Sequence, residues 1–136
     1  MDRAAYERYL AAFNARDYDA VLAHFADRFE VVFAGYAFRT ADQVRDFYRF
    51  FHACVDERIT LKAFLSNETM VALEADVRLE AHEDLTPAML EAQGLGGLFS
   101  LAKGQVITVP QFIHYHLDAN GKIVRALCAV YEPPRS

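Results

Sequence analysis

Apolar residues recur at helical spacing in the first half of the chain. Residues 4–15 carry one every three or four positions, which predicts an amphipathic helix. Asp17 predicts the N-cap of a second helix that continues to Phe25, and Thr40 predicts the N-cap of a third. A short strand is expected between them at 29–34. The apolar positions of the three helices are Tyr6, Tyr9, Leu10 and Phe13, then Val21, Leu22 and Phe25, then Val44, Phe47, Tyr48 and Phe51.

The hydrophobic period shortens to two residues in the second half of the chain. Leu61 and the apolar residues between 71 and 79 alternate with charged ones, which is typical of long antiparallel strands with one wet face. Two more strands are predicted at 105–117 and 123–131, joined by the turn sequence Asp-Ala-Asn-Gly. Helices followed by strands indicate an α+β fold, with the helices laid on one face of a curved sheet.

Residues 84–104 depart from this alternation. Thr86 and Pro87 predict the start of a short helix that ends near Gln93, because Thr is a favourable N-cap and Pro suits the first helical position. Glycines, leucines and a phenylalanine follow. The insert is interpreted either as a lid over a pocket, with glycine hinges, or as a long connection packed on the end of the sheet.

Composition and charge narrow the class of protein. The chain has 136 residues, the size of one domain over 1–136, and 54% hydrophobic residues can form a core and a small pocket. A net charge of −5 argues against a nucleic-acid partner. No apolar run approaches the roughly 18 residues that span a bilayer, and the charged start does not suit a secretory signal. Two cysteines without a CxxC pair favour a reducing compartment, so we expect a cytoplasmic protein without a membrane partner.

Three segments resemble a known superfamily. Residues 8–19, with the sequence RYLAAFNARDYD, are followed by HFAD at 24–27 and resemble its helix–helix opening. VRDFY at 44–48 resembles its third helix, and GKIVRAL at 121–127 resembles its final strand. The superfamily is the NTF2-like group, which includes ketosteroid isomerases, SnoaL-like polyketide cyclases and limonene epoxide hydrolases. The resemblance implies three helices on the concave side of a cone-shaped, mostly antiparallel sheet, a cystatin-like roll around a cavity.

The ketosteroid isomerases supply the nearest local match for a site. The tyrosine that donates to the developing oxyanion corresponds to Tyr9, and a second tyrosine of that network corresponds to Tyr48. The position of the proton-accepting acid corresponds to Phe33, and that of the protonated acid corresponds to Ile113. Neither residue carries a carboxyl group. Steroid isomerase activity itself is therefore not predicted, and the proton acceptor is left unidentified.

The resemblance also assigns a pocket wall. Its apolar members would be Phe13, Phe25, Phe33, Phe47, Phe51, Leu73, Val77, Ile113 and Val130. Gln111 and Tyr115 alternate with His114 and His116, so they should face the cavity beside Ile113 and serve as polar contacts for a ligand. Tyr36 is expected at the mouth of the cavity. Cys128 is expected on its wall as a buried, inert thiol.

The opposite face of the sheet is expected to form a subunit interface. Phe112, Leu127 and Tyr131 share that face with Arg125, and a mixture of aromatic residues and arginine suggests contact between two copies of the chain. His114 and His116 lie there too, but nearby arginines oppose a cation. We predict a homodimer, with no metal site and no cofactor.

Two classes of function remain open. The first is a SnoaL-like enzyme, an isomerase or cyclase, acting on a small hydrophobic carbonyl compound whose oxygen Tyr9 polarises. The second is a non-catalytic binding protein for a small apolar metabolite, in which the same tyrosines hydrogen-bond the ligand. A structural dimerisation module with a partly filled cavity is the third and weakest interpretation.

Overall fold

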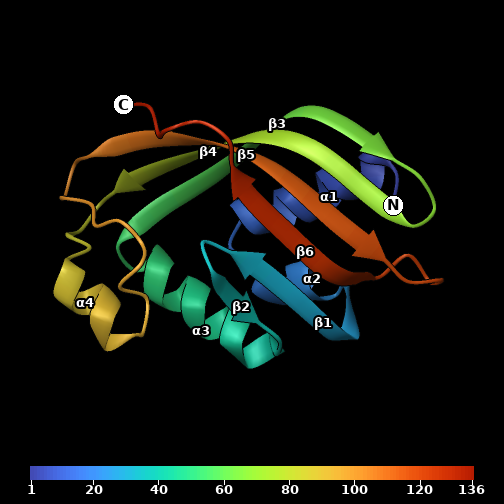
Figure 1. The fold of residues 1–136 in the computed structure, drawn as a ribbon, viewed down its shortest axis with the longest axis horizontal. Coiled ribbons are helices and arrows are strands. Elements are labelled where there is room, and N and C mark those ends of the chain that lie inside the picture. Colours follow the sequence, from blue (N-terminus) through green and yellow to red (C-terminus); the bar gives the residue numbers. More distant parts are fainter.

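The computed structural model describes all of residues 1–136 and has an α+β architecture, as the sequence predicts (Figure 1). Four helices and six strands follow one another along the chain. They are α1 (Arg3–Asn14), α2 (Tyr18–Leu22), β1 (Phe25–Phe33), β2 (Tyr36–Phe38), α3 (Ala41–His52), β3 (Val55–Ser66), β4 (Met70–Ala81), α4 (Pro87–Ala92), β5 (Val106–Leu117) and β6 (Ile123–Val130).

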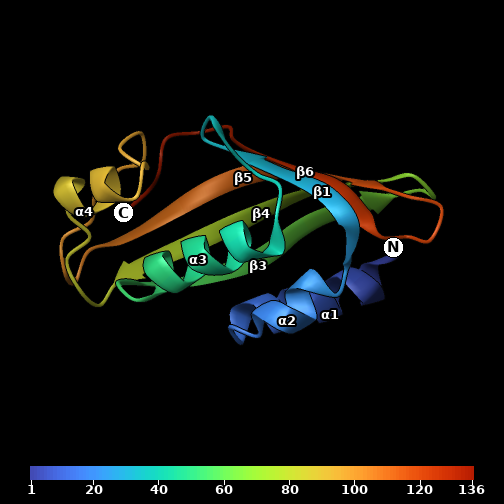
Figure 2. The same cartoon turned by 90° about the horizontal axis from the view of Figure 1, so that it is seen from below.

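The six strands form one sheet in the order β2-β1-β6-β5-β4-β3. Only β1 and β6 pair in parallel, and all other neighbours are antiparallel. The sheet is strongly arched and does not close, with α1, α2 and α3 on one side of the arch (Figure 2). The predicted curved, mostly antiparallel sheet with three helices on one face is confirmed.

Side-chain caps begin the helices where the sequence predicts them. Asp17 accepts a hydrogen bond from the backbone N–H of Ala20 at the start of α2. Thr40 and Gln43 form a capping box at α3, in which each side chain accepts from the other residue's backbone N–H. Thr86 caps α4 with a proline at its first position. None of the helices is both long and apolar enough to cross a bilayer.

The predicted second helix is too long, and one strand was not predicted. Helix α2 ends at Leu22, and Phe25 already pairs with Ile123 of β6, so β1 begins four residues earlier than expected. Pairing with a central strand satisfies backbone groups that a further helical turn would otherwise satisfy. After β1, Ala34 and Gly35 have φ of 50° and 83°, which makes a tight hairpin to the three-residue strand β2.

The buried apolar residues form two clusters. One cluster lies beneath α1 and includes Tyr6, Phe13 and Leu73, and the other includes Phe51 and the leucines of 84–104. Residues of the same sheet belong to both clusters, but side chains do not fill all of the space between the helices and the sheet. A cavity is lined by members of both clusters.

The 84–104 segment has a fixed base and an exposed tip. Leu85 and Leu101 pair through two backbone hydrogen bonds of 2.9 and 3.0 Å, and Leu90 and Leu95 are buried. Figure 1 shows α4 at one end of the sheet. Phe99 near the tip is 48% exposed. The base therefore resembles the packed connection that the sequence allows, whereas mobility of the tip stays a prediction.

Candidate functional site

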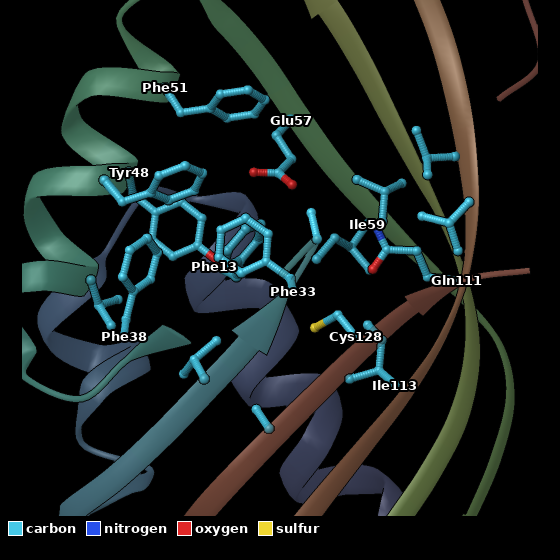
Figure 3. Close-up of a pocket in the computed structure, with 18 of the residues that line it drawn as sticks. Phe13, Phe33, Phe38, Tyr48, Phe51, Glu57, Ile59, Gln111, Ile113 and Cys128 are labelled. Atoms are coloured by element: carbon cyan, nitrogen blue, oxygen red, sulfur yellow. The ribbon is translucent and has the colours of Figure 1, made fainter. Parts of the chain in front are cut away.

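The cavity between α1, α3 and the sheet has a volume of about 370 Å³ (Figure 3). Twenty-four of its 26 lining residues are hydrophobic, and the two others are Glu57 and Gln111. No lysine or arginine lines it. The wall includes Leu98 and Phe99 from the tip of the 84–104 segment. The cavity is thus an apolar space with one acidic side chain.

Most residues that were expected on the wall do line the cavity. Those that do are Tyr9, Phe13, Phe25, Phe33, Phe47, Tyr48, Phe51, Val77, Gln111, Ile113, Tyr115, Cys128 and Val130. Leu73 and Tyr36 do not. Leu73 faces the same side of β4 as Val77, but at its position the sheet is covered by α1, so its side chain is packed in the cluster with Tyr6. Tyr36 turns toward the 84–104 segment, where its hydroxyl accepts a hydrogen bond of 2.7 Å from the Gly97 N–H.

Glu57 of β3 is the only carboxylate on the cavity wall, and it was not among the predicted site residues. Along this strand Val55, Glu57, Ile59 and Leu61 are the less exposed positions and alternate with exposed ones. Figure 3 shows the Glu57 carboxylate directed into the cavity beside Phe51. The signal was present in the sequence, because an acidic residue occupies an inward position of an alternating segment, but the strand was not extended back to Val55.

A histidine holds this carboxylate. His52 is in the last turn of α3, four residues after Tyr48, and its Nε2 lies 2.8 Å from Oε1 of Glu57. The other ring nitrogen, Nδ1, lies 2.6 Å from the hydroxyl oxygen of Tyr18 in α2. The His52 and Glu57 side chains are only 6% and 14% exposed. A short helix-to-strand corner at residues 53–54 brings the two residues together.

Aromatic packing fixes the orientation of the His52 ring. Tyr48 stacks on it with a centroid distance of 5.1 Å and an interplanar angle of 13°, and Tyr18 is nearly parallel to both. The ring of Phe13 meets the Tyr48 and His52 rings edge-on. Rings clamped in this way leave the imidazole little freedom to turn away from Glu57.

The strand that carries Glu57 is fixed from outside the sheet as well. β3 is an edge strand, so one side of its backbone has no neighbouring strand. Asn14, the last residue of α1, fills this gap at one residue. Its side-chain amide donates to the carbonyl of Ile59 at 3.1 Å and accepts from the Ile59 N–H at 3.0 Å. The backbone two residues from Glu57 is therefore held on both sides.

Two tyrosine hydroxyls are free to contact a molecule in the cavity. No protein group hydrogen-bonds to the hydroxyl of Tyr48, whereas the hydroxyl of Tyr9 interacts with that of Tyr115, and both residues line the cavity. Burial raises the pKa of both hydroxyls, and the pKa is raised further by the Glu57 carboxylate at Tyr48 and by the neighbouring Tyr6 at Tyr9. Both side chains therefore stay protonated and act as hydrogen-bond donors. The Tyr6 and Tyr115 hydroxyls are partners of one another instead, at 3.5 Å.

Cys128 and Gln111 complete the polar part of the wall. Burial, followed by the charge of Glu57, raises the pKa of the Cys128 thiol to about 12. Such a thiol is not a nucleophile at neutral pH. The Gln111 side chain extends toward the cavity near Ile59 (Figure 3). Its amide can both donate and accept a hydrogen bond.

A sequence model for the SnoaL-like domain matches residues 6–126, most of the chain. The chain belongs to the SnoaL-like domain family. No curated protein matches it by sequence.

Solved structures of the same fold resemble this SnoaL-like domain at low sequence identity. A candidate polyketide cyclase from Pseudomonas putida KT2440 is 23% identical, with 94% of this chain and 89% of that chain covered and a TM-score of 0.72. An LEH-like epoxide hydrolase from Mycobacterium tuberculosis is 16% identical, with 91% and 77% covered and a TM-score of 0.65. Another M. tuberculosis protein, in complex with estradiol-17β-hemisuccinate, is 15% identical, with 91% and 88% covered and a TM-score of 0.65. At these identities the likeness shows the fold.

The chemistry available to this SnoaL-like domain follows from its polar groups. A carboxylate can accept a proton, and neutral tyrosine hydroxyls can donate hydrogen bonds to an oxygen that gains negative charge. Because no cation lines the cavity, an anionic ligand would be repelled by Glu57 and would find no charged partner on the wall. The cavity is suited to an uncharged apolar molecule with one or two oxygen atoms.

Proposed function

We propose that this protein removes a proton from the carbon next to the carbonyl group of a small, uncharged, hydrophobic ketone. Glu57 accepts the proton, and the hydroxyls of Tyr9 and Tyr48 donate hydrogen bonds to the oxygen of the resulting enolate. The reaction would be an isomerisation or a cyclisation, both of which begin with such an enolate. The single observation that carries the proposal is the Glu57 carboxylate on the wall of an otherwise apolar cavity.

The surroundings of the carboxylate support a base rather than a stray buried charge. Its one hydrogen-bond partner is His52, through Oε1. The other oxygen, Oε2, has no protein partner and is available to a bound molecule. General bases of this kind contribute roughly 10²–10⁴-fold to the rate of a proton transfer. The raised pKa of Tyr48 keeps its hydroxyl neutral beside the base, so the two groups do not compete for the proton.

The size and the lining of the cavity support a compact apolar ligand. Its volume of about 370 Å³ lies near the small end of the roughly 300–1,000 Å³ range of ligand pockets. The ring-rich wall favours a flat or cyclic molecule. The same lining also supports the second candidate, a binding protein that holds a carbonyl compound through Tyr9 and Tyr48 without reaction, and one experiment distinguishes the two.

The experiment follows 2-tetralone, a bicyclic ketone with acidic protons next to its carbonyl, in D₂O by NMR. We expect the wild-type protein to accelerate exchange of these protons for deuterium and Glu57→Gln to lose this acceleration by about a hundredfold or more. Glu7→Gln, at an exposed glutamate of α1, is the matched control and should behave as wild type. Binding of 2-tetralone without accelerated exchange would favour the binding protein, and neither binding nor exchange would contradict both functions.

A further inference from the structure

Glu57 is the inner end of a continuous chain of hydrogen bonds. The Glu57 carboxylate bonds to Nε2 of His52 at 2.8 Å, and Nδ1 of His52 bonds to the Tyr18 hydroxyl at 2.6 Å. The three residues come from β3, α3 and α2. His52 is nearly fully buried, whereas Tyr18 is half-buried and does not line the cavity. The chain thus starts at the cavity wall and ends away from the cavity.

We propose that His52 and Tyr18 form a path by which Glu57 exchanges protons with water outside the cavity. This inference rests on the proposed function, because it assigns a route for the proton that Glu57 handles. It adds a positioning and relay role for two residues that do not line the cavity. If His52 only neutralised the Glu57 carboxylate, the contact between Nε2 and Glu57 would be enough, and Nδ1 would not need the Tyr18 hydroxyl.

The transfer balances without any additional reactant. In one state Glu57 is a carboxylate, the His52 proton is on Nε2, and Nδ1 accepts from the Tyr18 O–H. A water molecule gives a proton to the Tyr18 oxygen, Tyr18 gives its own proton to Nδ1, and Nε2 gives its proton to Oε1 of Glu57. Glu57 is now a carboxylic acid that donates to Nε2, and hydroxide is left in the water. The reverse sequence returns the carboxylate.

The cavity itself offers no comparable route. Glu57 is the only wall residue with a charged side chain, the tyrosine hydroxyls and the Cys128 thiol on the wall have raised pKa values, and a bound ligand of matching size would displace water from the cavity. His52 contacts Oε1 of Glu57 and does not line the cavity, so a ligand in the cavity does not take the place of this contact. A ligand can therefore isolate Glu57 from the mouth without isolating it from the relay.

The groups around Tyr18 suit the outer end of such a path. Burial raises the pKa of its hydroxyl, so the group carries a proton that it can pass on. Arg16 and Arg49 lower this pKa, and Glu57 raises it. The parallel rings of Tyr18, Tyr48 and His52 keep the donor and acceptor atoms aligned.

The relay is tested on the ring proton of His52 in the ligand-free protein, by water-exchange NMR on a sample with ¹⁵N-labelled histidine. We expect Tyr18→Phe to slow exchange of the Nε2 proton with water by at least tenfold. Glu57→Gln should slow it as well, because an amide cannot receive the Nε2 proton. Tyr18→Ala removes the ring, admits water to Nδ1 and should restore fast exchange. Tyr131→Phe removes a hydroxyl from the outer sheet face and is the control.

The direction of the change separates a relay from a purely structural contact. If Tyr18 only supports the packing, Tyr18→Phe loosens the site and leaves exchange unchanged or faster, and either result overturns the proposal. Unchanged exchange in Glu57→Gln also overturns it. The measurement requires no ketone and no turnover, so the proposed function can fail in the 2-tetralone experiment while the relay stands, and the reverse also holds.

Discussion

Two polar groupings, each with at least one residue on the cavity wall, differ in the chemistry that they can perform. The tyrosine grouping consists of Tyr6, Tyr9 and Tyr115 beneath α1, with ring centroids 5.5–5.8 Å apart. The acidic grouping consists of Glu57, His52 and Tyr18 beside α3. Burial raises the pKa of all three hydroxyls of the tyrosine grouping, so it can only donate hydrogen bonds at neutral pH. The acidic grouping joins three different kinds of proton carrier.

The difference shows that polar residues around one cavity can have separate roles, one group donating hydrogen bonds and the other accepting a proton. Hydroxyls that stay protonated can orient a carbonyl oxygen, and they cost little because each keeps an apolar ring in the core. A buried carboxylate with a histidine costs more, since desolvation opposes its charge. Such a pair is expected where chemistry requires it.

The largest effect is expected when one member of the acidic pair is removed. His52→Phe leaves the Glu57 carboxylate against apolar walls without its partner and should lower the free energy of unfolding by about 3 kcal/mol. The double variant His52→Phe with Glu57→Met should recover most of this loss, because an apolar pair of similar volume fills the same space. Urea unfolding of the three proteins measures both changes. A double variant as unstable as the single one would mean that the pair stabilises the fold.

A smaller effect is expected at the hydroxyls that face the cavity. Tyr9→Phe and Tyr48→Phe should each slow 2-tetralone exchange by about thirtyfold, or about 2 kcal/mol, because each removes one donor to the enolate oxygen. Tyr48 has no protein partner to lose, so the free energy of unfolding of Tyr48→Phe should stay within about 0.5 kcal/mol of wild type. Tyr9→Phe also loses its contact with the Tyr115 hydroxyl and should cost about 1 kcal/mol.

Tyr6→Phe is the matched comparison for these two variants. Its hydroxyl is paired with Tyr115, and it does not line the cavity. We expect it to cost about 1 kcal/mol of stability and to leave exchange near the wild-type rate. If Tyr6→Phe alone lost deuterium exchange of 2-tetralone, Tyr6 and not Tyr9 would be the donor to the enolate oxygen.

A few-fold effect is expected at Cys128, which reports the charge of Glu57. With a pKa of about 12, its thiol should react with iodoacetamide about tenfold faster for each pH unit from 7 to 10, because only the thiolate reacts. Glu57→Gln removes the second cause of the raised pKa and should speed the reaction about threefold at any of these pH values. Peptide mass spectrometry distinguishes Cys128 from Cys54. If Cys128 reacted equally fast in wild type and in Glu57→Gln, the negative charge of Glu57 would not reach the thiol, because the proton of His52 neutralises it.

The smallest effect on activity is expected from the outer sheet face. Phe112 and Tyr131 are 42% and 37% exposed, and their rings stack at 4.2 Å. We propose that this face, with Leu127 and Arg125, pairs two copies of the chain. Leu127→Glu with Tyr131→Glu should convert a dimer into a monomer in light scattering and leave 2-tetralone exchange unchanged. A wild-type monomer at high micromolar concentration would contradict the dimer.

More of the fold than of the site could be predicted from the sequence. Caps such as Thr40 and alternation such as that of β4 are local signals, and the local structure follows them. The end of α2 could not be placed in this way, because Phe25 fits a helical stripe as well as a strand, and pairing with Ile123, about a hundred residues away, decides between them.

The two polar groupings differ in the same respect. Tyr9 lies in a segment with a recognisable resemblance, so it could be proposed from sequence alone. The acidic grouping had no such guide, since Tyr18 and His52 lie 34 residues apart and meet only when α2 packs beside α3. Leu73 shows the converse error. Its face on β4 was predicted correctly, but the position along the arch at which α1 covers the sheet cannot be read from alternation.

The contact between Asn14 and Ile59 has a consequence for how the protein behaves in concentrated solution. An edge strand with free backbone donors and acceptors is a template on which strands of other chains can assemble. The Asn14 amide occupies both backbone groups of Ile59, in the middle of β3, as a neighbouring strand would. Without the Asn14 side chain, the N–H and C=O of Ile59 would also be unpaired, and a longer stretch of the β3 edge would be open to another strand. The Asn14 amide thus has two effects: it fixes the strand that carries Glu57, and it opposes edge-to-edge pairing of β3 with other chains.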